Sequence, residues 1–214
     1  MIKGLLIDLD GTLVDSVPAL FQVYKKFLAY YGKEGTKEEF NTLIGPSIDE
    51  IVEILKKKHG LKPSLHDLSI MYVSTLMKQG FEGTELFPNA KEVLEKAKKA
   101  GWKLGIVTSG TKALVKICLD PFKLGSLFDV IVTSEDVVKA KPSPEIYQFA
   151  IEKLGIAPGE IVAIEDSIGG KEAASSAGLK VILITHGKPA IAKDSKDVVN
   201  VADWKEVGSW LKLK

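Results

Sequence analysis

The sequence predicts an α/β protein in which a parallel sheet carries an inserted bundle of helices. Three observations lead to this fold class. Short apolar runs of the strand type alternate with helical patterns over the second half of the chain, as a parallel sheet with crossover helices requires. The first such run is separated from the second by nearly one hundred residues. This intervening segment has helical periodicity throughout, so an inserted domain is the economical explanation.

Five β-like runs are expected to form the sheet, and four of them are apolar enough to be buried on both faces. They are Lys3–Asp8, Lys103–Thr108, Val130–Thr133, Ile161–Glu165 and Lys180–Ile184. Helical patterns between the last four runs cover Thr111–Leu119, Ser143–Leu154 and Gly170–Ala177. Pro144 stands where proline is preferred, at the first helical position of the second pattern. This order of elements predicts a Rossmann-like core.

The inserted segment is expected to form a small helical bundle. Its first helix has one apolar stripe, Leu20, Tyr24, Phe27, Leu28 and Tyr31. The next three helices open with the polar pairs Thr36 and Glu39, Ser47 and Glu50, and Ser64 and Asp67, which are typical of helix N-termini. The last helix is expected to pack through Leu68, Met71, Val73 and Leu76. After Pro88, a helix over Asn89–Ala100 returns the chain to the sheet. The expected domains are therefore residues 1–14 with 87–214, and residues 15–86.

Composition limits the function. The chain has 214 residues, with 29 basic and 28 acidic side chains and a formal net charge of +1, which argues against nucleic acid or an anionic membrane as a partner. Every basic residue is lysine, so an anion must be held by lysine, backbone N–H groups or a metal ion. Carboxylates at positions 8 and 10 interrupt any signal peptide, and no apolar run approaches membrane-spanning length. We expect a soluble cytoplasmic protein, monomeric or homodimeric, with its single cysteine, Cys118, in the core.

Residues capable of chemistry follow the predicted strands. Carboxyl ends of parallel strands meet at one edge of a sheet, where helix N-termini also present free N–H groups. The candidates at this edge are Asp8, Asp10 and Gly11 after the first strand, Thr108, Ser109 and Gly110 after the second, Lys141 in the loop after the third, and Glu165 and Asp166 after the fourth. Together they predict an acidic site of about the size of a phosphate group.

The carboxylates predict a site for a hard cation. Asp8 and Asp10 are two residues apart on an extended strand, so their repulsion must raise a pKa or be offset by a cation. With Asp166 and Glu165 from a neighbouring strand, the oxygen ligands suit Mg²⁺. The three histidines, His59, His66 and His186, are scattered and are interpreted as surface or packing residues. No set of histidine and cysteine ligands therefore competes for zinc.

The same edge also provides groups that suit a phosphoryl group. A metal ion and Lys141 would offset the negative charge of the carboxylates. Thr108 and the N–H groups of Ser109 and Gly110 could supply neutral donors, and Gly11 lets the backbone approach an anion without a side chain in the way. The set is complementary to a phosphoryl group in transfer.

With these residues the sequence resembles the haloacid dehalogenase superfamily of phosphohydrolases. The four stretches that carry the resemblance are Asp8-Leu9-Asp10-Gly11-Thr12, Thr108-Ser109, Lys141-Pro142-Ser143-Pro144-Glu145 and Glu165-Asp166-Ser167-Ile168-Gly169-Gly170. The similarity spans nearly the whole chain. A helical insert directly after the first motif resembles the cap of the phosphoglycolate phosphatase and β-phosphoglucomutase branch, and the cap is expected to close over the site.

The resemblance implies a role for each site residue. Asp8 would attack phosphorus and form an aspartyl-phosphate, and Asp10 would be the general acid and base. Asp8, the backbone carbonyl of Asp10 and Asp166 would hold Mg²⁺, while Glu165 would either join them or orient them. Thr108 and Lys141 would bind phosphoryl oxygens. In the cap, the loop containing Gly45 and Ser47 is a candidate substrate contact, although Ser47 is favoured as a helix cap.

The resemblance implies a phosphatase for a small phosphomonoester, such as a sugar phosphate or phosphoglycolate. A phosphomutase is the second reading, weakened because Leu20 stands where the mutase branch has a cap-hinge histidine. A dehalogenase or a phosphonate-cleaving enzyme fits less well, because each lacks the acid at the position of Asp10. A signalling receiver domain is the third reading. It fits poorly because Asp8 lies on the first strand, before a large insertion.

Overall fold

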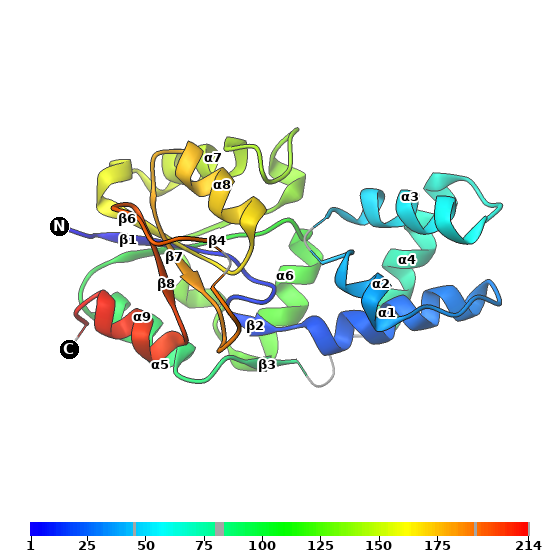
Figure 1. The fold of residues 1–214 in the computed structure, drawn as a ribbon. Coiled ribbons are helices and arrows are strands. Elements are labelled where there is room, and N and C mark those ends of the chain that lie inside the picture. The colour runs from blue at the N-terminus through cyan, green and yellow to red at the C-terminus, as the bar shows by residue number, and fades with distance from the viewer. Residues whose placement is uncertain (45, 80–83, 191, 214) are drawn as a thin grey trace. The chain divides into compact units, whose positions relative to one another are not determined.

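The structure is a computed structural model that describes residues 1–44, 46–79, 84–190 and 192–213. A six-stranded parallel sheet forms its centre, with strand order β5-β4-β1-β6-β7-β8 (Figure 1). The strands are β1 (Gly4–Ile7), β4 (Lys103–Val107), β5 (Val130–Val132), β6 (Ile161–Glu165), β7 (Lys180–Ile184) and β8 (Val198–Val201). The predicted α/β class and parallel sheet are confirmed. The sequence reasoning missed β8, the edge strand beside β7.

Helices flank the sheet on both faces. In Figure 1, α7 and α8 lie on one face and α5 and α9 on the other. These helices and α6 are α5 (Ala90–Lys99), α6 (Lys112–Leu119), α7 (Glu145–Leu154), α8 (Ile168–Ser176) and α9 (Trp204–Trp210). Short 3₁₀ turns cover Asp120–Phe122, Gly125–Leu127, Ser134–Asp136 and Pro158–Glu160. Pro144 precedes α7 as its N-cap rather than occupying its first turn, since the Pro144 carbonyl accepts the first helical bond, from Gln148 N–H at 2.9 Å. The sequence reasoning did not predict α9.

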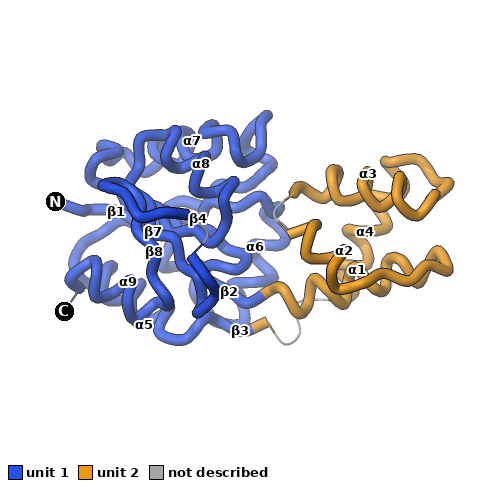
Figure 2. The backbone as a smooth tube through the Cα atoms, viewed as in Figure 1, with its two compact units in different colours: residues 1–15, 85–214 blue, residues 16–84 orange. Residues whose placement is uncertain are grey.

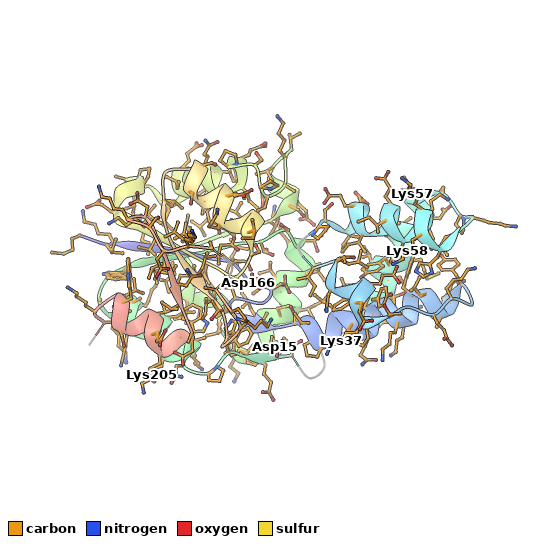
Figure 3. All side chains as sticks on the ribbon, viewed as in Figure 1. Asp15, Lys37, Lys57, Lys58, Asp166 and Lys205 are labelled. Carbon is orange, nitrogen blue, oxygen red and sulfur yellow. The ribbon has the colours of Figure 1, made fainter. Side chains whose placement is uncertain are left out.

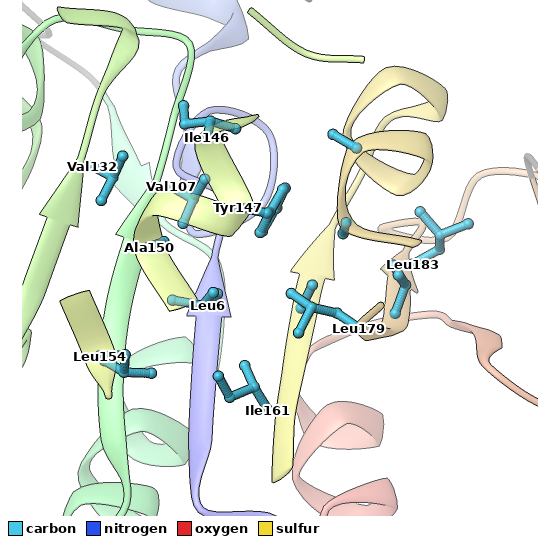
Figure 4. Close-up of a cluster of buried hydrophobic side chains, with 14 residues drawn as sticks. Leu6, Val107, Val132, Ile146, Tyr147, Ala150, Leu154, Ile161, Leu179 and Leu183 are labelled. Atoms are coloured by element: carbon cyan, nitrogen blue, oxygen red, sulfur yellow. The ribbon is translucent and has the colours of Figure 1, made fainter. Parts of the chain in front are cut away.

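One apolar cluster joins the sheet to α7 and α8 (Figure 4). Each of its members is at most 2% exposed, and burial of one large apolar side chain contributes roughly 1.5–3 kcal/mol. The cluster consists of Leu6, Val107, Val132, Ile146, Tyr147, Ala150, Leu154, Ile161, Ala163, Ala173, Ala174, Leu179, Val181 and Leu183. Cys118 of α6 is also buried, as expected. These contacts fix the carboxyl ends of the central strands, where the candidate residues lie.

The chain divides into two compact units (Figure 2). One consists of residues 1–15 and 85–214 and contains the sheet, and the other consists of residues 16–84. The short antiparallel strands β2 (Val14–Asp15) and β3 (Glu85–Leu86) pair with each other in the first unit. The chain therefore leaves the first unit directly after β2 and re-enters it at β3.

The second unit consists of helices, namely α1 (Val17–Tyr30), α2 (Lys37–Asn41), α3 (Ile48–His59) and α4 (Leu65–Gln79). Its buried apolar side chains include Val23, Tyr24, Phe27 and Leu28 of α1, Val52 and Leu55 of α3, and Leu68, Tyr72 and Leu76 of α4. Val73 was expected in this core, but it is 38% exposed and the adjacent Tyr72 is buried instead. No helix in the described ranges is long and apolar enough to cross a membrane.

The predicted helix starts at Ser47 and Thr36 differ in whether the glutamate three residues later completes a capping box. Ser47 forms a complete capping box with Glu50. Thr36 accepts a hydrogen bond from Glu39 N–H, but the Glu39 carboxylate accepts hydrogen bonds from the Tyr24 hydroxyl at 2.6 Å and pairs with the His59 ring at 2.8 Å. The Glu39 side chain is therefore an internal connection between helices rather than half of a capping box.

Candidate active site

A tight turn after β1 positions the first two aspartates. Asp8 N–H continues the parallel ladder to the Ile164 carbonyl at 3.0 Å. The turn is closed by hydrogen bonds from Gly11 N–H to the Val14 carbonyl at 2.9 Å and from Leu13 N–H to the Leu9 carbonyl at 2.9 Å. The apolar side chains within the turn are fully buried, so the core holds the Asp8 and Asp10 backbone in place.

Lys141 makes three contacts at this edge. Its ammonium group donates to Asp8 Oδ1 at 2.7 Å, to Glu165 Oε1 at 2.6 Å and to the Val107 carbonyl at 3.0 Å. An ammonium group has three donors, so these bonds define its position. Although burial alone would lower the pKa of Lys141, the charges of Asp8 and Glu165 raise it. The two carboxylates therefore favour the charged form of Lys141.

Glu165 anchors this lysine. Its Oε1 atom also accepts a hydrogen bond from the Tyr147 hydroxyl at 2.6 Å, and its Oε2 atom accepts one from the Ser167 hydroxyl at 3.3 Å. The first turn of α8 passes so close that a Cβ atom on Gly170 would lie 1.9 Å from Oε2. Glycine at position 170 therefore makes room for the carboxylate, and both of its oxygens are engaged by protein donors.

Asp166 brings a further carboxylate to the site, from the residue just after β6 (Figure 3). Ligand oxygens of Asp8, Glu165 and Asp166, the acidic cluster, all lie within 4.8 Å of one another. Thr12 donates to Asp166 Oδ1 at 3.3 Å. Burial, followed by the negative charges of Asp8 and Glu165, raises the pKa of Asp166 to about 8. Three carboxylates face one ammonium group, so the site has an excess of negative charge.

The donor set of this cluster fits a magnesium ion. Every ligand atom is a carboxylate oxygen, which is the chemistry that Mg²⁺ prefers. The raised pKa of Asp166 indicates that the protein alone leaves this charge only partly compensated. Gly11 adds a second indication, because its Cβ atom would lie 2.2 Å from Asp166 Oδ2. Only glycine lets the backbone at position 11 lie this close to the Asp166 carboxylate.

The loop after β4 places the predicted phosphate-binding group beside the same edge. Thr108 is 1% exposed, and its N–H donates to the Val132 carbonyl at 3.0 Å. Its Oγ1 atom accepts a hydrogen bond from Gly110 N–H at 3.0 Å, which directs the hydroxyl proton toward another acceptor. The Gly110 N–H expected to bind phosphate is thus engaged within the loop. Ser109 is partly exposed between them.

Asp10 is not among the three residues of the acidic cluster. The Asp10 carboxylate is close enough to Cys118 for its charge to add to the effect of burial in raising the pKa of that thiol. Ser47 donates to Glu50 Oε2 at 2.8 Å and accepts from Glu50 N–H at 3.4 Å, so its hydroxyl forms the helix cap. Gly45 lies outside the described residues.

Sequence reasoning assigned no role to three further residues at this edge. Tyr147 is one of the buried residues of α7, so its sequence position indicated only core packing. Trp204 belongs to α9, a helix that was not predicted. The Trp204 indole N–H donates to the Thr12 carbonyl at 2.9 Å, which fixes the turn that carries Asp10 and Gly11. Thr12 was part of the first motif, so its contact with Asp166 could have been anticipated from that motif.

The fold and the site together define an α/β protein with an acidic, oxygen-donor centre at the carboxyl edge of its sheet. Comparisons with known proteins identify the family. The model of the haloacid dehalogenase-like hydrolases matches residues 5–184. The chain belongs to this family and is an enzyme of the hydrolase class.

Individual relatives agree with this assignment. The chain is 32% identical over 187 residues to the phosphorylated carbohydrates phosphatase of Thermotoga maritima, covering 84% of this chain and 83% of that protein. It is 30% identical over 209 residues to the phosphoglycolate phosphatase of Escherichia coli O157:H7, covering 87% and 82%. The crystal structure of CbbY from Rhodobacter sphaeroides in complex with phosphate superposes with a TM-score of 0.86 at 26% identity, covering 97% of each chain.

Proposed function

We propose that the protein is a Mg²⁺-dependent phosphatase that hydrolyses a small phosphomonoester through an aspartyl-phosphate on Asp8. The observation that carries this proposal is the position of Asp8, which lies in contact with the Lys141 ammonium group and beside the Asp166 carboxylate. The Lys141 ammonium group on one side, and a Mg²⁺ ion held beside Asp166 on the other, would offset the repulsion between the Asp8 carboxylate and an anionic phosphoryl group. The names of the phosphatase relatives support the same reaction.

Each residue of the chain has a role in this proposal. Asp8 attacks phosphorus, and the bond to the leaving oxygen breaks as Asp10 donates a proton to it. Asp10 then takes a proton from the water molecule that releases phosphate from Asp8. Thr108 and Lys141 bind phosphoryl oxygens, and the N–H group of Ser109 is a further donor of the same loop, whereas the Gly110 N–H is already bonded to Thr108.

Asp8 and Asp166, with the backbone carbonyl of Asp10, would hold Mg²⁺, which when bound supplies positive charge to the phosphoryl oxygens. Glu165 belongs to the same acidic cluster. Because its oxygens already accept hydrogen bonds from Lys141, Tyr147 and Ser167, we assign it to the positioning of Lys141.

The proposed substrate is a small sugar phosphate or a phosphoglycolate-type acid. The phosphorylated carbohydrates and phosphoglycolate phosphatases among the relatives support this class. The absence of arginine from the chain also favours a substrate with few anionic groups. We further propose that residues 1–14 with 87–214 are the catalytic core and residues 15–86 a substrate-selecting cap domain.

Phosphate release from a panel of small phosphorylated metabolites, with Mg²⁺ or with a chelator, tests the function. We expect activity that requires Mg²⁺ and that falls by a factor on the order of 10³ or more in Asp8→Asn. Asp197→Asn is the matched control, because it removes an exposed carboxylate of the same unit and should leave activity unchanged. An isomerised sugar phosphate as the main product would instead support the phosphomutase. Full activity in the chelator would contradict the metal requirement.

A further inference from the structure

Tyr147 of α7 places a hydroxyl group inside the apolar core. Its side chain is fully buried and belongs to the cluster between the sheet, α7 and α8 (Figure 4). The hydroxyl donates to Glu165 Oε1 at 2.6 Å. Phenylalanine would fill the same space in the core without a polar group that must be satisfied. The hydroxyl of Tyr147 therefore calls for an explanation other than packing.

The oxygen that accepts from Tyr147 also accepts from Lys141. The distance from Lys141 Nζ to Glu165 Oε1 is 2.6 Å, and Nζ lies 5.4 Å from the centroid of the Tyr147 ring. Tyr147 thus contacts the ammonium group through its ring, and through its hydroxyl it contacts the carboxylate that pairs with this group. The torsion that turns a glutamate carboxylate has broad minima, so the hydroxyl limits where Oε1 can lie.

The backbone of the loop that carries Lys141 is held by other bonds. Glu145, the first residue of α7, accepts hydrogen bonds from Val138 N–H at 2.7 Å and from Lys139 N–H at 3.1 Å. These bonds do not involve the Tyr147 hydroxyl. Loss of that hydroxyl should therefore affect the ammonium end of Lys141 and leave its loop in place.

Two of the three acceptors around the Lys141 ammonium group decide where its third N–H points. The Val107 carbonyl, at 3.0 Å, belongs to β4, and Glu165 Oε1 is held by Tyr147. The third N–H donates to Asp8 Oδ1 at 2.7 Å. In the proposed function Asp8 is the nucleophile, so this N–H is the one that a phosphoryl oxygen would share.

We propose that Tyr147 is a positioning residue for Lys141: by fixing Glu165 Oε1 it directs the third N–H of the ammonium group to Asp8 and to the phosphoryl group that Asp8 attacks. This inference rests on the proposed function, which makes Asp8 the nucleophile and Lys141 a ligand of phosphoryl oxygens. It assigns Tyr147 no contact with the substrate, only with the groups that hold Lys141.

Two variants remove the hydroxyl. Tyr147→Phe keeps the ring, and Tyr147→Met replaces the ring with another apolar side chain, so the test needs only one of the two to fold. Tyr24→Phe is the matched control, because Tyr24 is fully buried in the helical unit and its hydroxyl donates to Glu39 at the same distance, 2.6 Å. Both phenylalanine variants lose a buried hydrogen bond to a carboxylate, so their thermal midpoints should fall by similar amounts.

The readout is the steady-state kinetics of p-nitrophenyl phosphate hydrolysis with Mg²⁺, together with inhibition by inorganic phosphate. A misplaced ammonium group loses contact with the phosphoryl group both before and during its transfer. We therefore expect Tyr147→Phe to lower kcat/KM roughly tenfold or more and to raise the inhibition constant of phosphate about threefold or more. Tyr24→Phe should change both by less than about twofold. A smaller fraction of folded protein would lower kcat alone.

A double-mutant cycle with Lys141→Ala tests whether the effect passes through the lysine. p-Nitrophenolate is a good leaving group, which favours residual turnover in Lys141→Ala. In this background Tyr147→Phe should change kcat/KM by less than about twofold, because the group that it positions is gone. A further loss as large as that in the wild-type background would overturn the proposal.

The kinetics can also contradict the proposal directly. Unchanged values in a folded Tyr147 variant, or a fall in kcat with unchanged KM and unchanged phosphate inhibition, would show that Tyr147 does not position Lys141. In either case an active wild type leaves the proposed phosphatase function intact. A wild type that is inactive toward every phosphomonoester would refute the proposed function, and this inference with it.

Discussion

Gly11 is the position where a single methyl group tests the metal site most sharply. In Gly11→Ala the new Cβ atom would lie 2.2 Å from Asp166 Oδ2, and real Cβ contacts essentially never fall below 3.0 Å. The carboxylate must therefore retreat by at least 3.0 − 2.2 = 0.8 Å. Metal–ligand distances tolerate only about 0.2 Å, so we expect the Mg²⁺ affinity to fall roughly 10–100-fold.

The same substitution also costs stability, because Gly11 has a φ angle of +82°. Alanine in this conformation is destabilising by about 1–2 kcal/mol. Gly178→Ala is the matched control, since Gly178 has a φ angle of +83° and nothing lies within 4 Å of its Cβ position. Urea unfolding should show similar losses in both variants, while calorimetric titration with Mg²⁺ should show weaker binding in Gly11→Ala alone. Equal Mg²⁺ affinities in the two variants would refute the reasoning.

Three further predictions concern stability. Tyr147→Phe removes the hydroxyl that donates to Glu165, so urea unfolding should show a loss of about 1–3 kcal/mol, and an unchanged midpoint would argue against this bond. Burial and neighbouring carboxylates raise the pKa of Asp166 from 3.8 to about 8. In a chelator, the contribution of Asp166 to the free energy of unfolding is therefore present in full below the unfolded pKa and is lost as the pH rises through about 8. Mg²⁺ should restore stability at high pH, and a metal-free protein that gains stability between about pH 6 and 9 would contradict this. Burial raises the pKa of Glu39, but hydrogen bonds, including that from Tyr24, outweigh burial and lower it. The contribution of Glu39 to the free energy of unfolding is therefore present above the unfolded pKa of 4.5 and is lost as the pH falls through the folded value. Glu39→Gln should remove this acid-sensitive part of helical-unit unfolding, measured by circular dichroism.

The sheet could be predicted because its central strands are buried on both faces. Such strands appear in the sequence as continuous apolar runs, and β6 (Ile161–Glu165) and β7 (Lys180–Ile184) match their expected bounds. β8 (Val198–Val201) could not be found in this way, because it is an edge strand, only partly buried over its first three residues. α9 (Trp204–Trp210) has only 7 residues, which is too short to show a helical period.

The candidate residues could be found because each follows a strand and the carboxyl ends of parallel strands meet. Their partners could not be found, since a hydrogen bond between distant residues leaves no local pattern. From the sequence Tyr147 could only be assigned to the core face of α7, yet its hydroxyl donates a hydrogen bond to Glu165. His186 was interpreted as a surface or packing residue, and the stack of its ring on Phe87 agrees with packing.

Acid-quenched wild-type protein, mixed with substrate and Mg²⁺ and analysed by tandem mass spectrometry, tests the central claim most directly. A phosphoryl group should be found on the peptide of Asp8, and the corresponding peptide of Asp8→Asn should carry none. A phosphoryl group on another side chain, or rapid turnover by Asp8→Asn, would show that Asp8 is not the nucleophile between Lys141 and Asp166.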